Sequence, residues 1–190
     1  MLKANFITAQ EAAEKIQDGS TLCTIGMTLV SASESILKAI EKRFETVGHP
    51  ADITLVHSCG QSDRKDGIQH LAHEGLVKRI IGSHWGLQPR WMEMIANSQV
   101  EAYCLPQGQI AQLYRSMACG LPGKMSKVGL GTFIDPRVEG GKMNDRTKPL
   151  PDIVDILEYS GEEYMFYKEI PLDTVLIRGT VCDEMGNLTT

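Results

Sequence analysis

The chain has 190 residues, 42% of them hydrophobic and 23% charged, a balance typical of a globular protein with a packed core. A net charge of −5 argues against general nucleic-acid binding, and no apolar run reaches the roughly 20 residues that cross a membrane. The N-terminus lacks the apolar centre of a signal peptide and the five cysteines include no C-x-x-C pair, so we expect a cytoplasmic protein with reduced thiols.

The first two thirds of the chain alternate predicted helices with short apolar strands. Thr8 and Glu11 form a capping box, which predicts a helix that runs through Ile16 and ends near Gly19. Apolar residues recur at helical spacing over 34–44, where Ser33 is the expected N-cap. The remaining predicted helices cover 70–77, 89–95 and 109–119, and the predicted strands cover 21–25, 53–56, 79–82 and 100–105.

These strands are continuous apolar runs, which indicates burial on both faces. Their alternation with helices predicts the α/β class: an open, mostly parallel sheet with helices on both faces, in three α/β/α layers. We expect one domain over residues 1–190, because the sequence contains no repeat, low-complexity segment or linker.

The last third begins with a glycine-rich tract, residues 124–144. Gly129 and Gly131 interrupt its apolar run, and glycines at this spacing let a backbone approach a ligand closely. We therefore interpret the tract as one wall of a site. A hairpin is predicted over 153–159 and 163–167 around Ser160-Gly161, and a last central strand over 175–177.

Several predicted strands end in a polar segment that contains glycine. These exits hold Gly26, Gly60, Gly82 and Gly108. Ligands of open α/β sheets bind outside the carboxyl ends of the strands, so we expect the exits and the glycine tract to form one cleft.

Several common site motifs are missing. Gly26 has no second and third glycine of a dinucleotide fingerprint, and nothing matches a Walker A loop or an esterase elbow. His70 and His73 do not form an H-E-x-x-H zinc motif, so we favour surface histidines over a metal site. Trp85 and Trp91 are interpreted as packing residues.

Six stretches carry a resemblance to a known family. They are 18–27 (Asp-Gly-Ser-Thr-Leu-Cys-Thr-Ile-Gly-Met), 73–76 (His-Glu-Gly-Leu), 82–85 (Gly-Ser-His-Trp), 106–108 (Pro-Gln-Gly), 128–144 with its Gly-Leu-Gly-Thr-Phe-Ile-Asp-Pro-Arg, and 176–180 (Leu-Ile-Arg-Gly-Thr). Together they resemble the α half of class I coenzyme A transferases, above all the fused-chain type that includes acetate and propionate CoA-transferases. The family's Gly-Gly-Phe reads Ile25-Gly26-Met27 here.

The resemblance implies transfer of coenzyme A between a short-chain acyl-CoA, such as acetyl-CoA, and a carboxylic acid. Coenzyme A is then a substrate, and neither a cofactor nor a metal is expected. In the family a glutamate of the β half attacks the thioester, forming an acyl–glutamyl anhydride and then a glutamyl-CoA thioester. The positions that the resemblance assigns to CoA and acyl binding are Gly26, Met27, Gln107, Gly108, Gly129, Gly131, Thr132 and Phe133.

The resemblance also implies that the β half lies outside this chain, which stops before the last helix and strand of an α half. Glu184-Met185-Gly186-Asn187 echoes the β half's Glu-Asn-Gly motif, but its position places it in the α half, so we expect no catalytic residue here. Expected partners are the β half, an acyl-CoA and a short-chain carboxylate, without nucleic acid or membrane. We also expect a homo-oligomer, formed near the strand 175–177 and the segment 181–190.

Two further readings stay open. The chain could be a non-catalytic remnant or binding module that keeps the fold, rather than a fragment or one chain of a two-chain transferase. A sugar-phosphate isomerase is a weaker alternative, since such enzymes share the fold class but need an acidic base. Asp135 is available, yet beside Pro136 we expect it to cap a turn.

Overall fold

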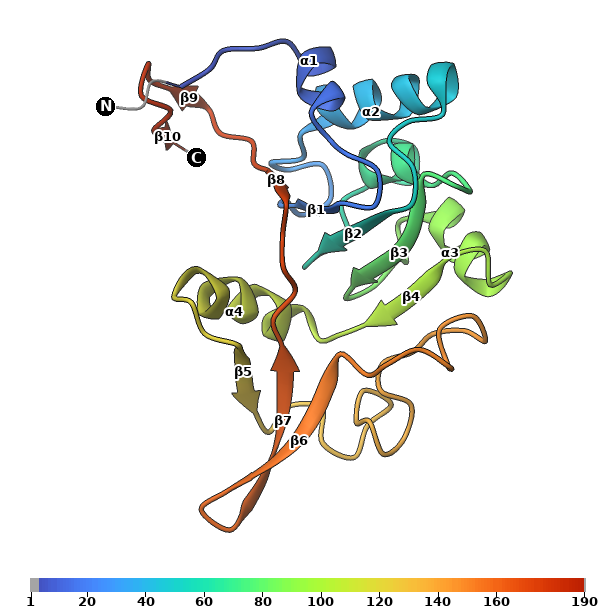
Figure 1. The fold of residues 1–190 in the computed structure, drawn as a ribbon, viewed down its shortest axis with the longest axis vertical. Helices are drawn as coiled ribbons and strands as arrows, with labels where there is room; N and C mark the ends of the chain where they lie inside the picture. The colour runs from blue at the N-terminus through green and yellow to red at the C-terminus, as the bar shows by residue number, and fades with distance from the viewer. Residues whose placement is uncertain (1–3, 190) are drawn as a thin grey trace.

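The computed structural model describes residues 4–189 and has a five-stranded parallel sheet at its centre (Figure 1). The strands follow the order β4-β3-β2-β1-β8, and each neighbouring pair is parallel. Their bounds are β1 Thr21–Thr24, β2 Ile53–His57, β3 Val77–Gly82, β4 Glu101–Cys104 and β8 Thr174–Leu176. The predicted α/β class with a parallel sheet is confirmed.

Helices cover both faces of this sheet. One face carries α1 (Ala9–Glu14), α2 (Glu34–Val47), the 3₁₀ helix η1 (Gly67–Leu71) and α3 (Pro89–Ala96), whereas α4 (Gln107–Ala118) lies on the other. Successive strand residues point to opposite faces, so Leu22 packs in the core under α1–α3 and Cys23 in the core on the α4 side. The capping box at Thr8 is confirmed.

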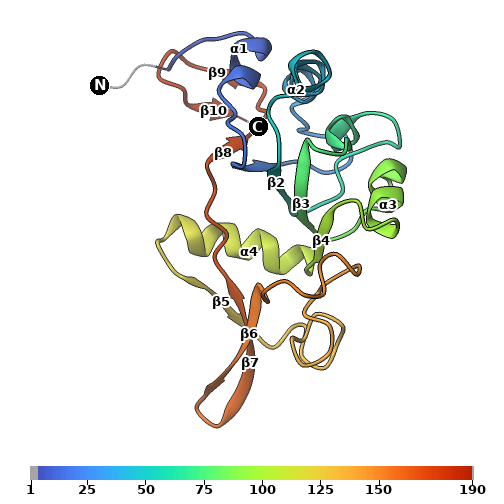
Figure 2. The ribbon, with the colours of Figure 1, turned by 45° about the vertical axis from the view of Figure 1, so that its right-hand side comes forward.

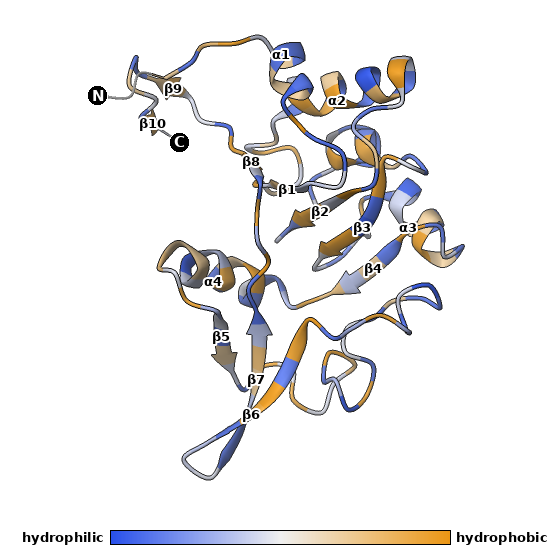
Figure 3. Ribbon diagram, viewed as in Figure 1, coloured by the Kyte–Doolittle hydropathy of each residue, from blue (hydrophilic) through white to orange (hydrophobic). Residues whose placement is uncertain are grey.

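A second, antiparallel sheet in the order β5-β7-β6 lies beyond α4, which Figure 2 shows between the two sheets. Its strands are β5 (Gly123–Ser126), β6 (Val154–Tyr159) and β7 (Glu162–Lys168). The predicted hairpin is confirmed, with Tyr159 paired to Glu162 across the Ser160-Gly161 turn. Figure 3 shows the strands of the central sheet as mostly hydrophobic and the tip of this hairpin as hydrophilic.

Two element predictions are wrong. The helix predicted over 70–77 is η1 followed by a turn, because Val77 already pairs with Ile53 in the sheet. The strand predicted as central, β8, is the edge strand of the sheet, and within residues 4–189 it pairs with β1 alone. Beyond β8, the chain forms a hairpin of β9 (Val181–Cys182) and β10 (Leu188–Thr189), which the sequence analysis did not predict.

Within residues 4–189, the structure contains no helix with the length and apolar character that a membrane span requires. The five cysteines are all free thiols.

Candidate functional site

The carboxyl ends of β1 to β4 form a single edge of the central sheet. Thr24 and His57 pair at the ends of β1 and β2, and Gly82 and Cys104 pair at the ends of β3 and β4. The exits of all four strands therefore lie along this edge, as predicted. Their role in binding stays a prediction.

The exit of β1 is a tight turn that encloses Gly26. Met27 and Val30 exchange backbone hydrogen bonds of 3.0 and 2.8 Å, and a side chain at Gly26 would place its Cβ 2.8 Å from the Val30 carbonyl oxygen. This turn accounts for the glycine without a ligand. Met27 remains available for binding, because 57% of its surface is exposed.

The exit of β4 leads directly into α4. Gln107 and Gly108, predicted as a polar loop, are the first residues of this helix, and both are exposed. Pro106 precedes them and brings no side-chain cap to the helix N-terminus. The Oε1 atom of Gln109 is buried without a hydrogen-bond partner in the described chain. The start of α4 is thus a polar end at the same edge as Gly26.

The glycine-rich tract joins the two sheets. It begins in β5, and its last part lies beside β4, where Cys104 N–H donates to the carbonyl of Gly141 at 2.7 Å. A Cβ at Gly141 would come within 2.6 Å of the Cys104 carbonyl oxygen, so this close pairing requires glycine. β5 itself was missed by the sequence analysis.

A clamp of two side chains sets the shape of the tract around Gly129 and Gly131. The Tyr167 hydroxyl donates to the carbonyl of Val128 at 2.6 Å, and a Cβ at Gly129 would lie 2.7 Å from that hydroxyl. At the other end, Gly131 N–H donates to the buried carboxylate of Asp135 at 2.9 Å. Gly131 has a φ of +69°, and a Cβ there would meet nothing within 4 Å.

Asp135 caps this turn, as predicted. Its carboxylate also accepts from the backbone and the guanidinium of Arg137, which in turn pairs with Glu163 on β7. The Arg137 hydrogen bond, offset in part by burial, holds the pKa of Asp135 well below its usual range. A carboxylate engaged in this way is poorly suited to be the base that an isomerase needs.

The two parts of the predicted site, the exit of β1 and the glycine-rich tract, border the same hydrophobic core. Ile25, next to Gly26, and Leu130, between Gly129 and Gly131, pack against the same buried cluster on the α4 side. Thr132 and Phe133 follow and are exposed. Beside the β1 exit lies a pocket of about 550 Å³, which is lined by the first turn of α2, residues 177–179 and Leu188. None of the eight predicted binding residues lines this pocket, so a single cleft formed by the strand exits and the glycine-rich tract stays a prediction.

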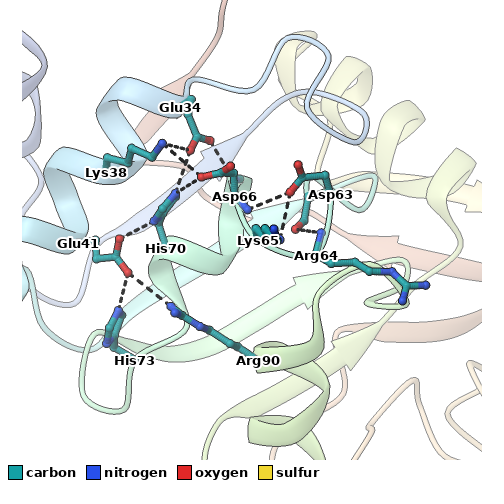
Figure 4. Close-up of polar contacts among 12 residues, drawn as sticks. Glu34, Lys38, Glu41, Asp63, Arg64, Lys65, Asp66, His70, His73 and Arg90 are labelled. Atoms are coloured by element: carbon teal, nitrogen blue, oxygen red, sulfur yellow. Dashed lines mark hydrogen bonds and ion pairs between the residues drawn. The ribbon is translucent and has the colours of Figure 1, made fainter.

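The histidines of the rejected zinc motif form a network with carboxylates from α2 (Figure 4). His70 contacts Glu41 through Nδ1 and Glu34 through Nε2, the latter at 2.8 Å, while His73 contacts Glu41 at 2.9 Å. Burial lowers the pKa of His70, but the hydrogen bonds that its ring donates to Glu41 and Glu34 outweigh this effect and leave the pKa raised. A neutral imidazole has one N–H, so two carboxylate partners indicate an imidazolium.

This network could also bring together three metal ligands, since Glu34, Asp66 and His70 offer atoms within 4.8 Å of one another. However, Lys38 already pairs with both carboxylates, at 3.1 and 3.2 Å. The charge of these carboxylates is therefore neutralised by cationic side chains of the network itself.

Glu184 lies in the turn of the β9–β10 hairpin and is exposed. The neighbouring Asp183 organises this turn, accepting hydrogen bonds from the backbone of Met185 and Asn187. A carboxylate nucleophile requires a dry pocket lined with donors. The exposed position of Glu184 supports the expectation that it is not one.

Sequence reasoning missed the side chains that shape the site, namely Tyr167, Arg137 and Glu163. It also gave no role to His84, whose ring packs against Gly60 in the exit of β2. Tyr167 and Glu163 are brought in by β7, far along the chain, so only the spacing of Asp135 and Arg137 offered a local signal.

Comparisons with known proteins cover almost all of the chain. A family model described as Coenzyme A transferase matches residues 6–190. The caffeate CoA-transferase of Acetobacterium woodii is 43% identical over 187 residues, which are 98% of this chain and 35% of that protein. The crystal structure of the acyl-CoA transferase YdiF apoenzyme from Escherichia coli O157:H7 matches with a TM-score of 0.93 and 35% identity, over 98% of this chain and 36% of that one.

A third relative, the alpha subunit of an acetate CoA-transferase from Escherichia coli K12, is 26% identical over 188 residues, which are 99% of this chain and 76% of the subunit. The chain therefore spans about a third of the length of the first two proteins, at 35% and 36%, and corresponds to most of an alpha subunit.

Proposed function

Because this chain belongs to the coenzyme A transferase family, we propose that it is the α portion of an enzyme that moves coenzyme A between a short-chain acyl-CoA and a carboxylic acid. The observation that carries the proposal is the match of the family over residues 6–190, which includes both the strand exits and the glycine-rich tract. In this proposal the chain supplies loops for CoA and acyl binding, and a β half supplies the glutamate nucleophile. The enzyme acts in the cytoplasm.

The proposed division of labour follows from the side chains at the edge. The eight predicted binding residues include no carboxylate, so they can position a thioester but cannot supply the carboxylate that forms an acyl–glutamyl anhydride. Exposed backbone at the start of α4 offers donors to an anionic group. The chain alone is therefore expected to bind coenzyme A without turnover.

Two measurements test this proposal. Isothermal titration calorimetry with coenzyme A and acetyl-CoA should detect binding to the purified chain, and acyl exchange between acetyl-CoA and acetate should be absent. Glu184→Gln should leave the affinity for coenzyme A unchanged. Turnover by the chain alone that Glu184→Gln abolishes would contradict the proposal and make Glu184 the nucleophile.

A chimeric enzyme distinguishes the proposed α-portion role from the alternative that the chain is a binding module. In the Acetobacterium woodii caffeate CoA-transferase, the stretch that matches this chain over 187 residues would be replaced by this chain. Transferase turnover by the chimera would support the α-portion role. A folded chimera that binds coenzyme A but shows no turnover, beside an active parent enzyme, would favour the binding module.

A further inference from the structure

The exits of β2 and β3 bring an exposed histidine to the centre of the site edge. His84 follows β3 directly, and its ring packs against Gly60, the exit glycine of β2. An added Cβ at Gly60 would lie 2.4 Å from Cε1 and 2.8 Å from Nδ1 of that ring. Only glycine at position 60 leaves room for the imidazole in this position.

Gly60 also connects His84 to the exit of β1. Its carbonyl oxygen accepts a hydrogen bond of 2.9 Å from the N–H of Thr28, which follows the predicted binding residue Met27. The strand order places β2 between β1 and β3. His84 and the Gly26–Thr28 turn therefore both contact Gly60.

The imidazole has free hydrogen-bonding capacity. Over residues 4–189, neither ring nitrogen of His84 has a hydrogen-bond partner, and the side chain is exposed. Three polar atoms at neighbouring strand ends are buried without a partner in the same part of the chain: Thr24 Oγ1, Ser83 Oγ and Gln61 Oε1. Gln61 is fully buried, and its amide group is oriented by donation from Nε2 to the carbonyl of Thr24 at 2.7 Å. Buried polar groups without partners are rare and indicate a missing ligand or water.

We propose that His84 contacts the substrate and binds the carboxylate of the short-chain acid through a ring N–H. The proposal rests on the proposed function, in which that acid is a substrate. A carboxylate supplies only acceptor oxygens, whereas a ring N–H of His84 and the hydroxyl groups of Thr24 and Ser83, at the ends of β1 and β3, are donors. Nothing in the step is covalent: His84 holds the anion, and the reaction itself needs the glutamate of the β half.

The test follows acetate binding to the purified chain by NMR, with two reporters. The first is the Cε1–H signal of His84, and the second is the methyl signal of Met27 in the adjacent turn, 57% of whose surface is exposed. Sodium acetate is titrated against sodium chloride at equal ionic strength. Both signals should respond to acetate alone, and His84→Ala should weaken the acetate affinity read from Met27 by about tenfold. His84→Asn, which keeps an N–H donor, should restore part of that loss.

His49→Ala is the matched control, since His49 is an exposed histidine that pairs with Asp18 at the other end of the sheet.

An unchanged acetate affinity in His84→Ala, or a response at Met27 without one at His84, would overturn the proposal. The lack of any acetate response would overturn it as well. Binding of coenzyme A in calorimetry stands independently of these results, so failure here leaves the proposed function in place.

Discussion

Gly131 offers the sharpest test of the role of the glycine-rich tract, because a side chain at this position can obstruct a ligand without clashing with the rest of the protein. Its N–H is already taken by Asp135, so it cannot donate to a ligand, but a Cβ at this position would enter open space. Alanine at its φ of +69° costs about 1–2 kcal/mol of backbone strain without a clash. We expect Gly131→Ala to fold, to lose about 1–2 kcal/mol of unfolding free energy, and to bind coenzyme A at least about tenfold more weakly.

Gly161 provides the matched control, because it has a φ of +78° and also nothing within 4 Å of an added Cβ. It lies in the turn of the β6–β7 hairpin, so Gly161→Ala should lose a similar unfolding free energy and keep its affinity. Urea denaturation and calorimetry with coenzyme A measure the two quantities. Equal coenzyme A affinity in folded Gly131→Ala and the parent chain would refute the reasoning, as would an equal loss in Gly161→Ala. Valine is a poorer probe than alanine, since a β-branched residue strains strongly at positive φ.

Two predictions concern stability and assembly. His70→Gln should lower the unfolding free energy by about 1–3 kcal/mol near pH 6. Because the pKa of His70 is raised in the folded state, the stabilisation that His70 contributes is complete below its ordinary pKa of 6.5 and is lost as the pH rises through the folded-state pKa. Because the pKa of Glu41 is lowered, the stabilisation that Glu41 contributes is lost as the pH falls below 4.5 and through the folded-state pKa of Glu41. Urea unfolding as a function of pH measures this, and a difference from the parent that stays constant into alkaline pH would contradict it. Separately, the unpaired edge of β8 exposes 44% of Val175 and, just beyond it, 57% of Ile177, so the chain should self-associate and Val175→Lys should weaken the association. Sedimentation velocity over a range of concentrations tests it, with a monomer at every concentration as the contrary result.

The elements predicted correctly carry local signals. The Thr8 capping box, the apolar runs of β1 to β4 and the Ser160-Gly161 turn each determine structure within a few residues. β5 carries no such signal, since Lys124-Met125-Ser126 is a strand only through its pairing with β7. Similarly, the apolar residues of β8 predict a strand but not its position at the edge of the sheet. The position depends on pairing with β1, which is distant in the sequence.

The candidate site was predicted less completely than the fold. Strand exits could be located because parallel strands end together, yet the reason for each glycine lies in distant residues. Gly26 accommodates the Val30 carbonyl, Gly129 the Tyr167 hydroxyl and Gly60 the His84 ring. A motif shows that a position excludes a side chain. Only the structure shows whether another part of the protein or a ligand occupies the space that the side chain would fill.

The pairing of β8 with β1 also bears on how the chain reaches this structure. Thr21 N–H donates to the carboxylate of Asp173 at 2.8 Å, although the two residues are 152 positions apart. The β5-β7-β6 sheet and α4 lie between them in the chain, so the central sheet is completed by a strand that is synthesised after a whole second sheet. Closing so long a loop is entropically costly, whereas the β6–β7 hairpin closes over a two-residue turn. We therefore expect the hairpin to form early in folding and β8 to dock late, leaving the rim of β1 exposed on the nascent chain until then.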